Sequence, residues 1–187
     1  MRKLIYSMSA SLDGYIAAPG DNLDWSEPTD EVHWWFNDRA RTLGMSLYGR
    51  RIWELMSAHW PTADEQPNAT PVTIDFAKTW RAVPKVVFSS TVTEVDWNTR
   101  IHRGDAVEEI TRLKTEDGGD MEIAGATLAG TAMRAGLIDE YEVMFRPILL
   151  GAGKPFFSSL DNWVNLRLLG TQTFTGDAVL LRYETRR

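Results

Sequence analysis

Glycine, arginine and hydroxyl side chains follow two short apolar segments of this chain, at points where β-strands would end. Gly49-Arg50-Arg51 comes directly after the segment S-L-Y, and Ser89-Ser90-Thr91 comes after K-V-V-F. A phosphate beside the first group would meet free backbone N–H groups and two guanidinium groups. The alternative is a pair of solvated arginines at the start of a helix, and this motif does not decide between the two.

The segment 120–157 has the layout of a strand, a glycine turn, a helix, a second strand and a glycine loop. Its first apolar run ends at Gly125, and a helical pattern begins just after Thr127, so a strand would deliver the chain to the N-terminus of a helix. Free N–H groups there suit a phosphate or the polar edge of a ring. The turn lacks the G-x-G-x-x-G fingerprint, and any βα unit can use glycine in its turn, so this segment alone does not establish a nucleotide site.

The later glycine loop, L-L-G-A-G-K-P, lacks what a phosphate-binding Walker A loop requires. Such a loop needs a glycine five positions before the G-K pair and a serine or threonine after it, whereas this chain has Ile148 and Pro155 at those positions. A glycine loop that closes near a cofactor fits better than an ATPase.

Asp13 lies in the turn S-L-D-G, which ends the first predicted strand. An aspartate before glycine most often accepts hydrogen bonds within its own turn, and a catalytic acid is the other interpretation. His33, His59 and His102 have no metal-ligand spacing, and no nucleophile–histidine arrangement is visible. We therefore expect no metal site.

Composition limits the classes to which this protein can belong. A length of 187 residues predicts one domain, and the absence of cysteine excludes disulfides, thiolate metal sites and a cysteine nucleophile. A net charge of −6 without a basic run argues against nucleic acid as the main partner. The N-terminal apolar run is too short for a signal peptide, and no membrane-spanning segment is apparent, so we expect a cytoplasmic protein.

Hydrophobic periodicity predicts strands that alternate with helices. The strands are expected at residues 3–8, 45–48, 85–88, 100–102, 120–124, 140–147, 164–172 and 178–183. Helices are expected from just after residue 29 to about 44, from 50 to about 56, from 105 to 114 and after residue 127. The segment 59–71 contains three prolines and is expected to be a surface loop. The alternation predicts an α/β fold, with a largely parallel sheet covered on both faces and an antiparallel hairpin around residues 175–177.

Five ordered motifs resemble the dihydrofolate reductase superfamily: S-L-D-G-Y-I-A, G-D-N-L-D-W, Y-G-R-R-I-W-E, V-F-S-S-T and A-G-A-T-L. The resemblance covers nearly the whole chain. The S-L-D-G turn, R-A-G-L-I-D-E-Y and P-I-L-L-G-A-G-K-P-F-F are most similar to the C-terminal reductase domain of the bifunctional deaminase-reductase of riboflavin biosynthesis and to its stand-alone bacterial relatives. The resemblance implies a three-layer, dihydrofolate reductase-like fold with about eight strands.

In that superfamily NADPH lies across the carboxyl ends of the strands, so the resemblance implies this cofactor. It assigns phosphate binding to Gly49, Arg50 and Arg51, the adenosine end with its 2′-phosphate to Ser89, Ser90 and Thr91, and the pyrophosphate and nicotinamide side to Ala124, Gly125, Ala126, Thr127 and Leu128. Relatives commonly have glycine where this chain has Ala124, and the methyl group could crowd the approach of the cofactor to the backbone.

The resemblance also suggests residues for the substrate. True dihydrofolate reductases carry a carboxylate on the helix after the substrate loop, and the matching segment P-T-D-E-V-H-W-W-F allows two registers, which place either Asp30 or Val32 at that position. In the riboflavin branch the S-L-D-G aspartate faces the substrate, which favours Asp13 as the acid. Trp25 and Trp35 would either form an apolar wall that stacks the substrate or belong to the core.

The implied function is hydride transfer from NADPH to a small planar heterocycle, pteridine-like or pyrimidine-like, or to a carbonyl compound. The activity would resemble either 5-amino-6-(5-phosphoribosylamino)uracil reductase or dihydrofolate reductase. The alternative is a non-catalytic nucleotide-binding or structural homologue with the same fold. The long apolar strands near the C-terminus and the riboflavin branch both predict a homodimer.

Overall fold

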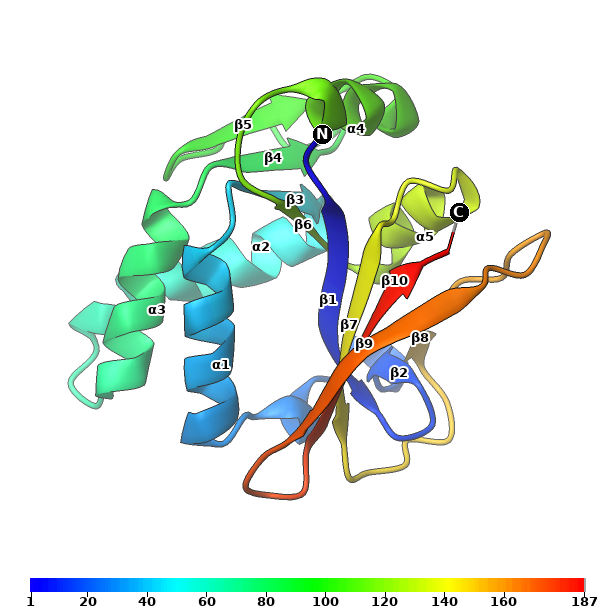
Figure 1. Ribbon diagram of the computed structural model, residues 1–187. Helices are drawn as coiled ribbons and strands as arrows, with labels where there is room; N and C mark the ends of the chain where they lie inside the picture. The colour runs from blue at the N-terminus through cyan, green and yellow to red at the C-terminus, as the bar shows by residue number, and fades with distance from the viewer. Residues whose placement is uncertain (187) are drawn as a thin grey trace.

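The computed structural model describes residues 1–186, and its framework is an eight-stranded sheet (Figure 1). The strands are β1 (Leu4–Ser11), β3 (Met45–Gly49), β4 (Lys85–Phe88), β5 (Thr99–His102), β6 (Met121–Ala124), β7 (Glu140–Arg146), β9 (Leu166–Thr173) and β10 (Val179–Thr185). Their order across the sheet is β5-β4-β3-β6-β1-β7-β10-β9. The first six in this order pair in parallel, whereas β10 is antiparallel to both β7 and β9. The prediction of a mostly parallel sheet with a C-terminal antiparallel hairpin is confirmed.

A second sheet of two short strands, which the sequence did not predict, joins the S-L-D-G turn to the late glycine loop. Strand β2 (Tyr15–Ala17) pairs antiparallel with β8 (Lys154–Pro155). Gly153 has a φ of 142° and lies so close to the Ala17 carbonyl that a Cβ there would be 2.0 Å from the oxygen. Only glycine fits at this position. The close approach fixes the next residue, Lys154, beside Ala17 of β2.

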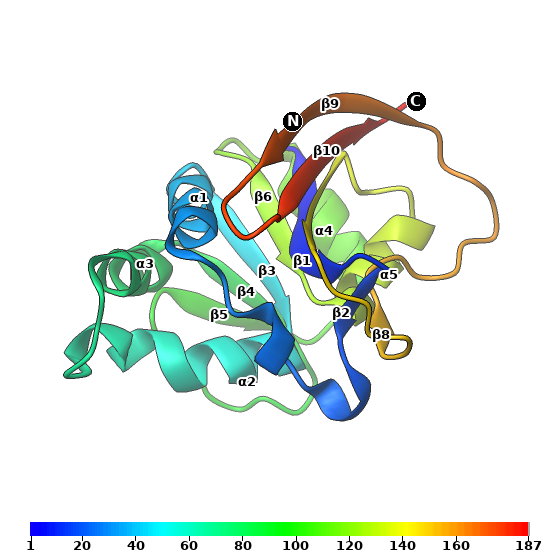
Figure 2. The ribbon, with the colours of Figure 1, turned by 90° about the horizontal axis from the view of Figure 1, so that it is seen from below.

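Helices cover both faces of the large sheet, which gives the three layers seen in Figure 2. The helices α1 (Asp30–Arg41), α2 (Arg50–His59) and α3 (Pro71–Ala82) lie on one face, and α4 (Ala106–Thr115) and α5 (Ala126–Arg134) lie on the other. Short 3₁₀ helices occur at Pro19–Asp21, Asp24–Ser26 and Trp60–Glu65. None of the helices in residues 1–186 is long and apolar enough to cross a bilayer.

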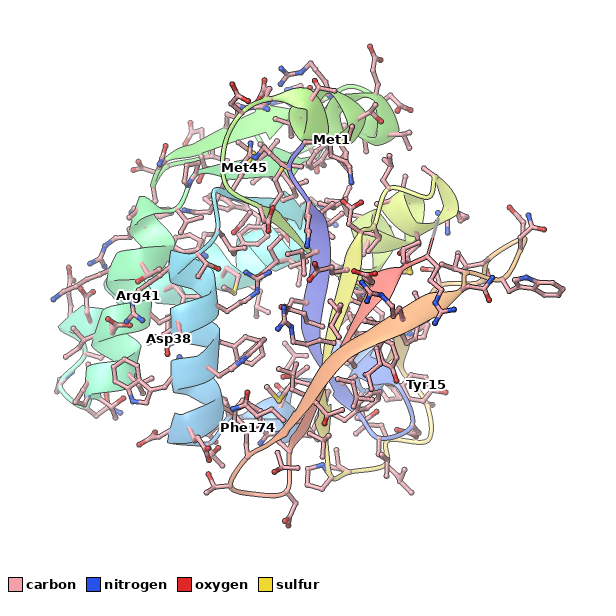
Figure 3. All side chains as sticks on the ribbon, viewed as in Figure 1. Met1, Tyr15, Asp38, Arg41, Met45 and Phe174 are labelled. Carbon is pink, nitrogen blue, oxygen red and sulfur yellow. The ribbon has the colours of Figure 1, made fainter. Side chains whose placement is uncertain are left out.

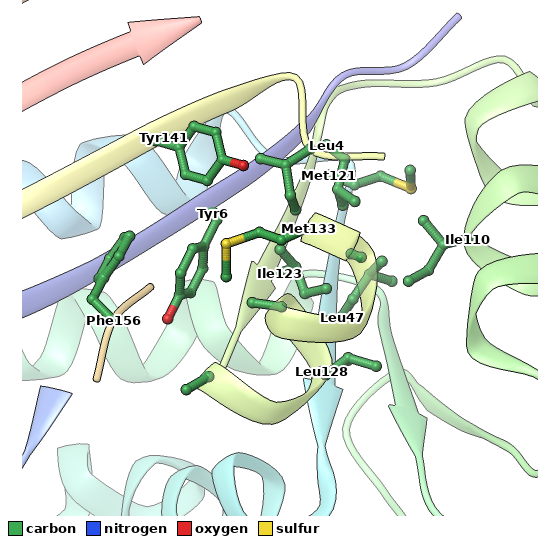
Figure 4. Close-up of a cluster of buried hydrophobic side chains, with 14 of the residues drawn as sticks. Leu4, Tyr6, Leu47, Ile110, Met121, Ile123, Leu128, Met133, Tyr141 and Phe156 are labelled. Carbon is green, nitrogen blue, oxygen red and sulfur yellow. The ribbon is translucent and has the colours of Figure 1, made fainter. Parts of the chain in front are cut away.

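The larger core lies under α4 and α5, where apolar side chains alternate along the central strands. Leu47 and Ile123 point to this face and pack with Ile110 of α4 and Met133 of α5 (Figure 4). On the opposite face the packing is aromatic and joins strand residues to α2 and α3, through Tyr48, Trp53, Trp80, Val87 and Ala124. The sheet therefore packs one face against a mainly apolar core, and its other face leaves room for a site.

Helix α1 is fixed beside α3 by polar contacts. The Asn37 side chain donates to the Val72 carbonyl at 2.9 Å and to the Asp75 carboxylate at 2.7 Å. Arg41 forms ion pairs with Asp38 and Asp75, and Figure 3 labels Asp38 and Arg41 on the side of α1 that faces α3. These contacts fix α1 and α3 side by side, so that the two helices form one wall over the sheet.

The prediction of a surface loop at residues 59–71 is wrong in part. Trp60–Glu65 forms a 3₁₀ helix in which Pro61 and Ala63 are buried. Helix α3, for which no prediction was made, begins at Pro71, and the Thr70 side chain caps it by accepting from the Thr73 N–H at 3.3 Å. A proline at the first helical position, after a threonine cap, is typical of the start of a helix. Here the two other prolines of residues 59–71 made the whole segment look like a loop.

Candidate active site

The carboxyl ends of β3, β4 and β6 open into a cavity of about 960 Å³, which we call the outer cavity. Because parallel strands end at the same edge of a sheet, three segments far apart in the sequence meet there. All the residues assigned to the cofactor line it, except Ala124: Gly49, Arg50, Arg51, Ser89, Ser90, Thr91, Gly125, Ala126, Thr127 and Leu128. The structure therefore brings the predicted groups together at one concave surface.

The turn at Gly125 delivers the chain to the N-terminus of α5 in a conformation that requires glycine. Its φ is 93°, and a Cβ there would lie 2.7 Å from Cγ1 of Ile52. The Gly125 N–H points to the sulfur of Met8 at 3.2 Å. At the end of the neighbouring strand, Gly49 precedes the first turn of α2. Two helix N-termini with their unpaired N–H groups thus border the same cavity, which favours an anionic ligand.

Cationic side chains at the outer cavity are held by carboxylates at its rim. Arg50 pairs with Glu54 at 2.9 Å, and Arg51 pairs with Asp21. Lys154 reaches the same Asp21 carboxylate at 3.1 Å, and the pKa of Asp21 lies below its usual value because Lys154 hydrogen-bonds it. All these side chains are substantially exposed, so each pair is weak and a bound phosphate can replace the carboxylate.

Sequence reasoning missed Lys154 and Asp21 as cavity residues. The G-A-G-K loop was the available signal, and it was expected to close near a cofactor, but that expectation did not single out Lys154. Its position beside the cavity comes from the β2–β8 pairing, and a two-residue strand has no periodicity by which it can be recognised.

A second cavity of about 570 Å³, the inner cavity, lies between the sheet and the wall of α1, α2 and α3. Its upper lining is apolar and aromatic: Ile52, Leu55, Met56, Trp60 and Phe76. Its floor on the sheet is mostly polar and includes Ser7, Ser46, Tyr48 and Glu122. Met8, Ile52 and Leu55 line both cavities, so the two spaces join at these three side chains.

Glu122 is the titratable group of the floor that sequence reasoning missed. It lies on the central strand β6, level with Ser46 of β3 and Ile5 of β1. Burial raises the pKa of its carboxyl to about 7, against the opposing charge of Arg39. A glutamate inside an apolar strand, M-E-I-A, was the available signal, because a carboxyl in that setting needs a partner or a ligand.

Asp13 lies in an exposed turn that is tied to the late glycine loop. Its carboxylate accepts hydrogen bonds from the Ser11 hydroxyl at 2.6 Å and from the backbone N–H of Gly151 at 2.7 Å and of Leu150 at 3.1 Å. These bonds, with that of Ser11 first, hold its pKa below the usual value. Asp13 therefore connects the S-L-D-G turn with the loop that leads to Lys154, outside the two cavities.

The residues suggested for the substrate are placed differently from one another. Asp30 lines the inner cavity at the start of α1. Trp35 packs edge-on against Phe36 at 5.0 Å and also against Phe174, in a small core between α1 and the C-terminal hairpin. Trp25 follows the first loop and has a buried indole nitrogen. Ala124 directs its methyl group to the inner cavity and the aromatic cluster.

Searches among known proteins found relatives along the full length of the chain. A family profile described as RibD C-terminal domain matches residues 2–180. The uncharacterized protein YyaP of Bacillus subtilis (strain 168) is 30% identical over 186 residues, which cover 97% of this chain and 94% of YyaP.

Two solved structures have the same fold. A putative riboflavin biosynthesis protein from Shewanella sp. PV-4 superimposes with a TM-score of 0.74 at 22% identity and covers 100% of both chains. Dihydrofolate reductase from Enterococcus faecalis, complexed with NADP(H), gives a TM-score of 0.66 at 17% identity and covers 99% of this chain and 97% of that enzyme. The fold is that of dihydrofolate reductase, and the chain belongs to the RibD C-terminal domain family.

Proposed function

We propose that this protein is an NADPH-dependent reductase that transfers hydride to a small planar heterocycle or a carbonyl compound. The observation that carries the proposal is the junction of two cavities of different chemistry. The outer cavity offers helix N-termini and arginines, whereas the inner cavity offers apolar walls over a polar floor, and they join at Met8, Ile52 and Leu55. Membership of a reductase-domain family supports the same reading.

The donors around the outer cavity fit NADPH. N–H groups at the starts of α2 and α5 suit the pyrophosphate, and Arg50, Arg51 and the hydroxyls after β4 suit the 2′-phosphate. When bound, the cofactor supplies the hydride, and the residues of the chain bind both molecules, orient them and exclude water. Asp13 remains the acid suggested by the family resemblance, and its hydrogen bonds to the loop at 150–151 favour a positioning role.

The test is oxidation of NADPH by the purified protein in the presence of a panel of pteridines, pyrimidines and carbonyl compounds. The proposal expects turnover with at least one planar acceptor and quenching of tryptophan fluorescence when NADPH binds. Quenching without turnover on any acceptor would favour a non-catalytic nucleotide-binding homologue. The observation that favours this non-catalytic homologue is Ala124, which stands where relatives commonly have glycine.

We also propose a homodimer formed through the C-terminal hairpin. Strand β9 is at the edge of the sheet, and Leu168 is 51% exposed and Leu169 is 39% exposed. An apolar edge strand is a template for pairing with a second copy. Light scattering should therefore give twice the chain mass of 21.2 kDa, and a mass of one chain would refute the dimer.

A further inference from the structure

The floor of the inner cavity contains one carboxyl that differs from its neighbours on the same sheet face. Glu142 is bound by Arg39 at 2.8 Å and by Arg182 at 3.1 Å, and Glu140 is paired with Lys3. None of the hydrogen bonds within residues 1–186 reaches the Glu122 carboxyl, which lies on the cavity surface. A half-buried carboxyl that accepts no hydrogen bond from the described residues is free to receive a ligand that donates to it.

The indole of Trp80 lies beside the polar floor. Trp80 lines the same cavity and is 3% exposed, and its Nε1 interacts with the Tyr48 hydroxyl without a well-formed hydrogen bond. Ser46 and Tyr48 lie beside Glu122 on the floor, and both hydroxyls can donate or accept. The inner end of the cavity thus offers one strong acceptor surrounded by small polar groups.

Lysine and arginine side chains that could hold a phosphate are not free in this cavity, as far as the described residues go. Lys85 is the one lysine or arginine that lines it within residues 1–186, and its ammonium donates to the carbonyls of Trp80 and, at 2.6 Å, of Val83. Burial also lowers the pKa of Lys85 to about 8. Arg39, on α1 beside the floor, is bound to Glu142. A phosphorylated substrate would therefore meet no free lysine or arginine among the described residues of this cavity, and its phosphate would approach the Glu122 carboxyl.

We propose that Glu122 is the specificity-determining residue of the inner cavity, where its carboxyl accepts hydrogen bonds from adjacent N–H groups of an unphosphorylated, amino-substituted aromatic heterocycle. The aromatic walls, Trp60 and Phe76, fit the faces of such a ring, and the carboxyl fits an edge with two donors. This heterocycle would be the substrate of the reductase proposed above, so its role as substrate rests on that proposed function. Its binding at Glu122 does not.

Binding of two matched planar probes to the protein without cofactor tests the proposal. The first probe, 2-aminobenzimidazole, presents an amino group next to a ring N–H, and the second, 2-benzimidazolone, has a carbonyl in place of that amino group. Titration calorimetry should show that the wild-type protein prefers the amino probe. Glu122→Gln should weaken binding of the amino probe about tenfold to a hundredfold, the scale of a lost charge-assisted pair, and leave the carbonyl probe within about threefold.

Two variants serve as controls. Glu116→Gln removes an exposed carboxylate of the Arg112 pair on the far face and should bind both probes like the wild type. Glu122→Asp keeps the charge and should retain the preference for the amino probe at reduced affinity, and melting curves check that each variant is folded. The proposal is overturned if the folded Glu122→Gln variant binds the amino probe as well as the wild type does, or if the wild type binds it no better than the carbonyl probe.

These measurements separate the substrate class from the reaction. Probe binding that depends on Glu122, without NADPH oxidation on any acceptor, would refute the reductase and keep the recognition site. NADPH oxidation without any effect of Glu122→Gln on probe binding would support the reductase and refute Glu122 as the recognition site.

Discussion

The outer and inner cavities are adjacent, but they are built in different ways. The outer cavity is made mainly of backbone at strand ends, with glycines at the turns and helix N-termini, so its residues form short continuous motifs. The inner cavity is made of single side chains that project from three strands and three helices, and Glu122 is one residue in an apolar strand. The first kind of site is tolerant of most substitutions except at glycine, whereas the second depends on each side chain separately.

The largest effect should come from the glycine turn of the outer cavity. Gly125→Ala places a Cβ 2.7 Å from Ile52 Cγ1 at a φ of 93°, so both a steric clash and backbone strain are expected. The free energy of unfolding should fall by about 2–4 kcal/mol, and NADPH binding should be lost with the turn geometry. Denaturant unfolding and calorimetry measure the two effects.

Gly136→Ala is the matched control for that variant. Gly136 also has a positive φ, 66°, but none of the residues from 1 to 186 has an atom within 4 Å of its added Cβ. This variant should cost only about 1 kcal/mol of strain and bind NADPH normally. Equal losses in the two variants would mean that the turn at Gly125 has no special role.

The carboxyl of the inner cavity should instead make the protein less stable as the pH rises. The folded pKa of Glu122 is raised from 4.5 to about 7, so between these values the native state holds a proton that the unfolded chain releases. The free energy of unfolding therefore falls as pH rises through this window, by about 1–3 kcal/mol. Glu122→Gln should remove the fall and stabilise the protein at pH 8, as measured by denaturant unfolding at about pH 5 and pH 8.

Arg39 and Glu142 are the charged groups that act on Glu122, and both stay in place in this variant. A Glu122→Gln variant with the same pH dependence as the wild type would show that the carboxyl is hydrated and titrates as in free solution.

A smaller effect is expected at Asp13, which ties the outer-cavity loop from outside. Asp13→Asn weakens the hydrogen bonds to Leu150 and Gly151 and should lower the free energy of unfolding slightly. NADPH affinity should fall a few-fold because the loop carries Lys154. Turnover per folded molecule, measured on the same sample, decides its role, since a loss of about a hundredfold would make Asp13 a catalytic acid.

The same contrast explains what the sequence could predict. Strand periodicity and the motifs at residues 49–51, 89–91 and 125–128 were sufficient for the fold class and for the outer cavity. Glu122, Lys154 and helix α3 were missed for separate physical reasons. The setting of Glu122 depends on which strands flank β6, Lys154 is placed by a two-residue strand, and the start signal of α3 at Thr70 and Pro71 was hidden among other prolines.

Titration calorimetry with NADPH and NADH tests most directly whether the outer cavity holds the cofactor. Arg50, Arg51 and the hydroxyls of Ser89 and Thr91 line one cavity, and a charge-assisted pair to the 2′-phosphate is worth about 1.5–3 kcal/mol. NADPH should therefore bind about tenfold to a hundredfold more tightly than NADH, and the Arg50→Gln, Arg51→Gln double variant should bind the two equally. Equal affinities in the wild-type protein, or no binding of either, would contradict the account.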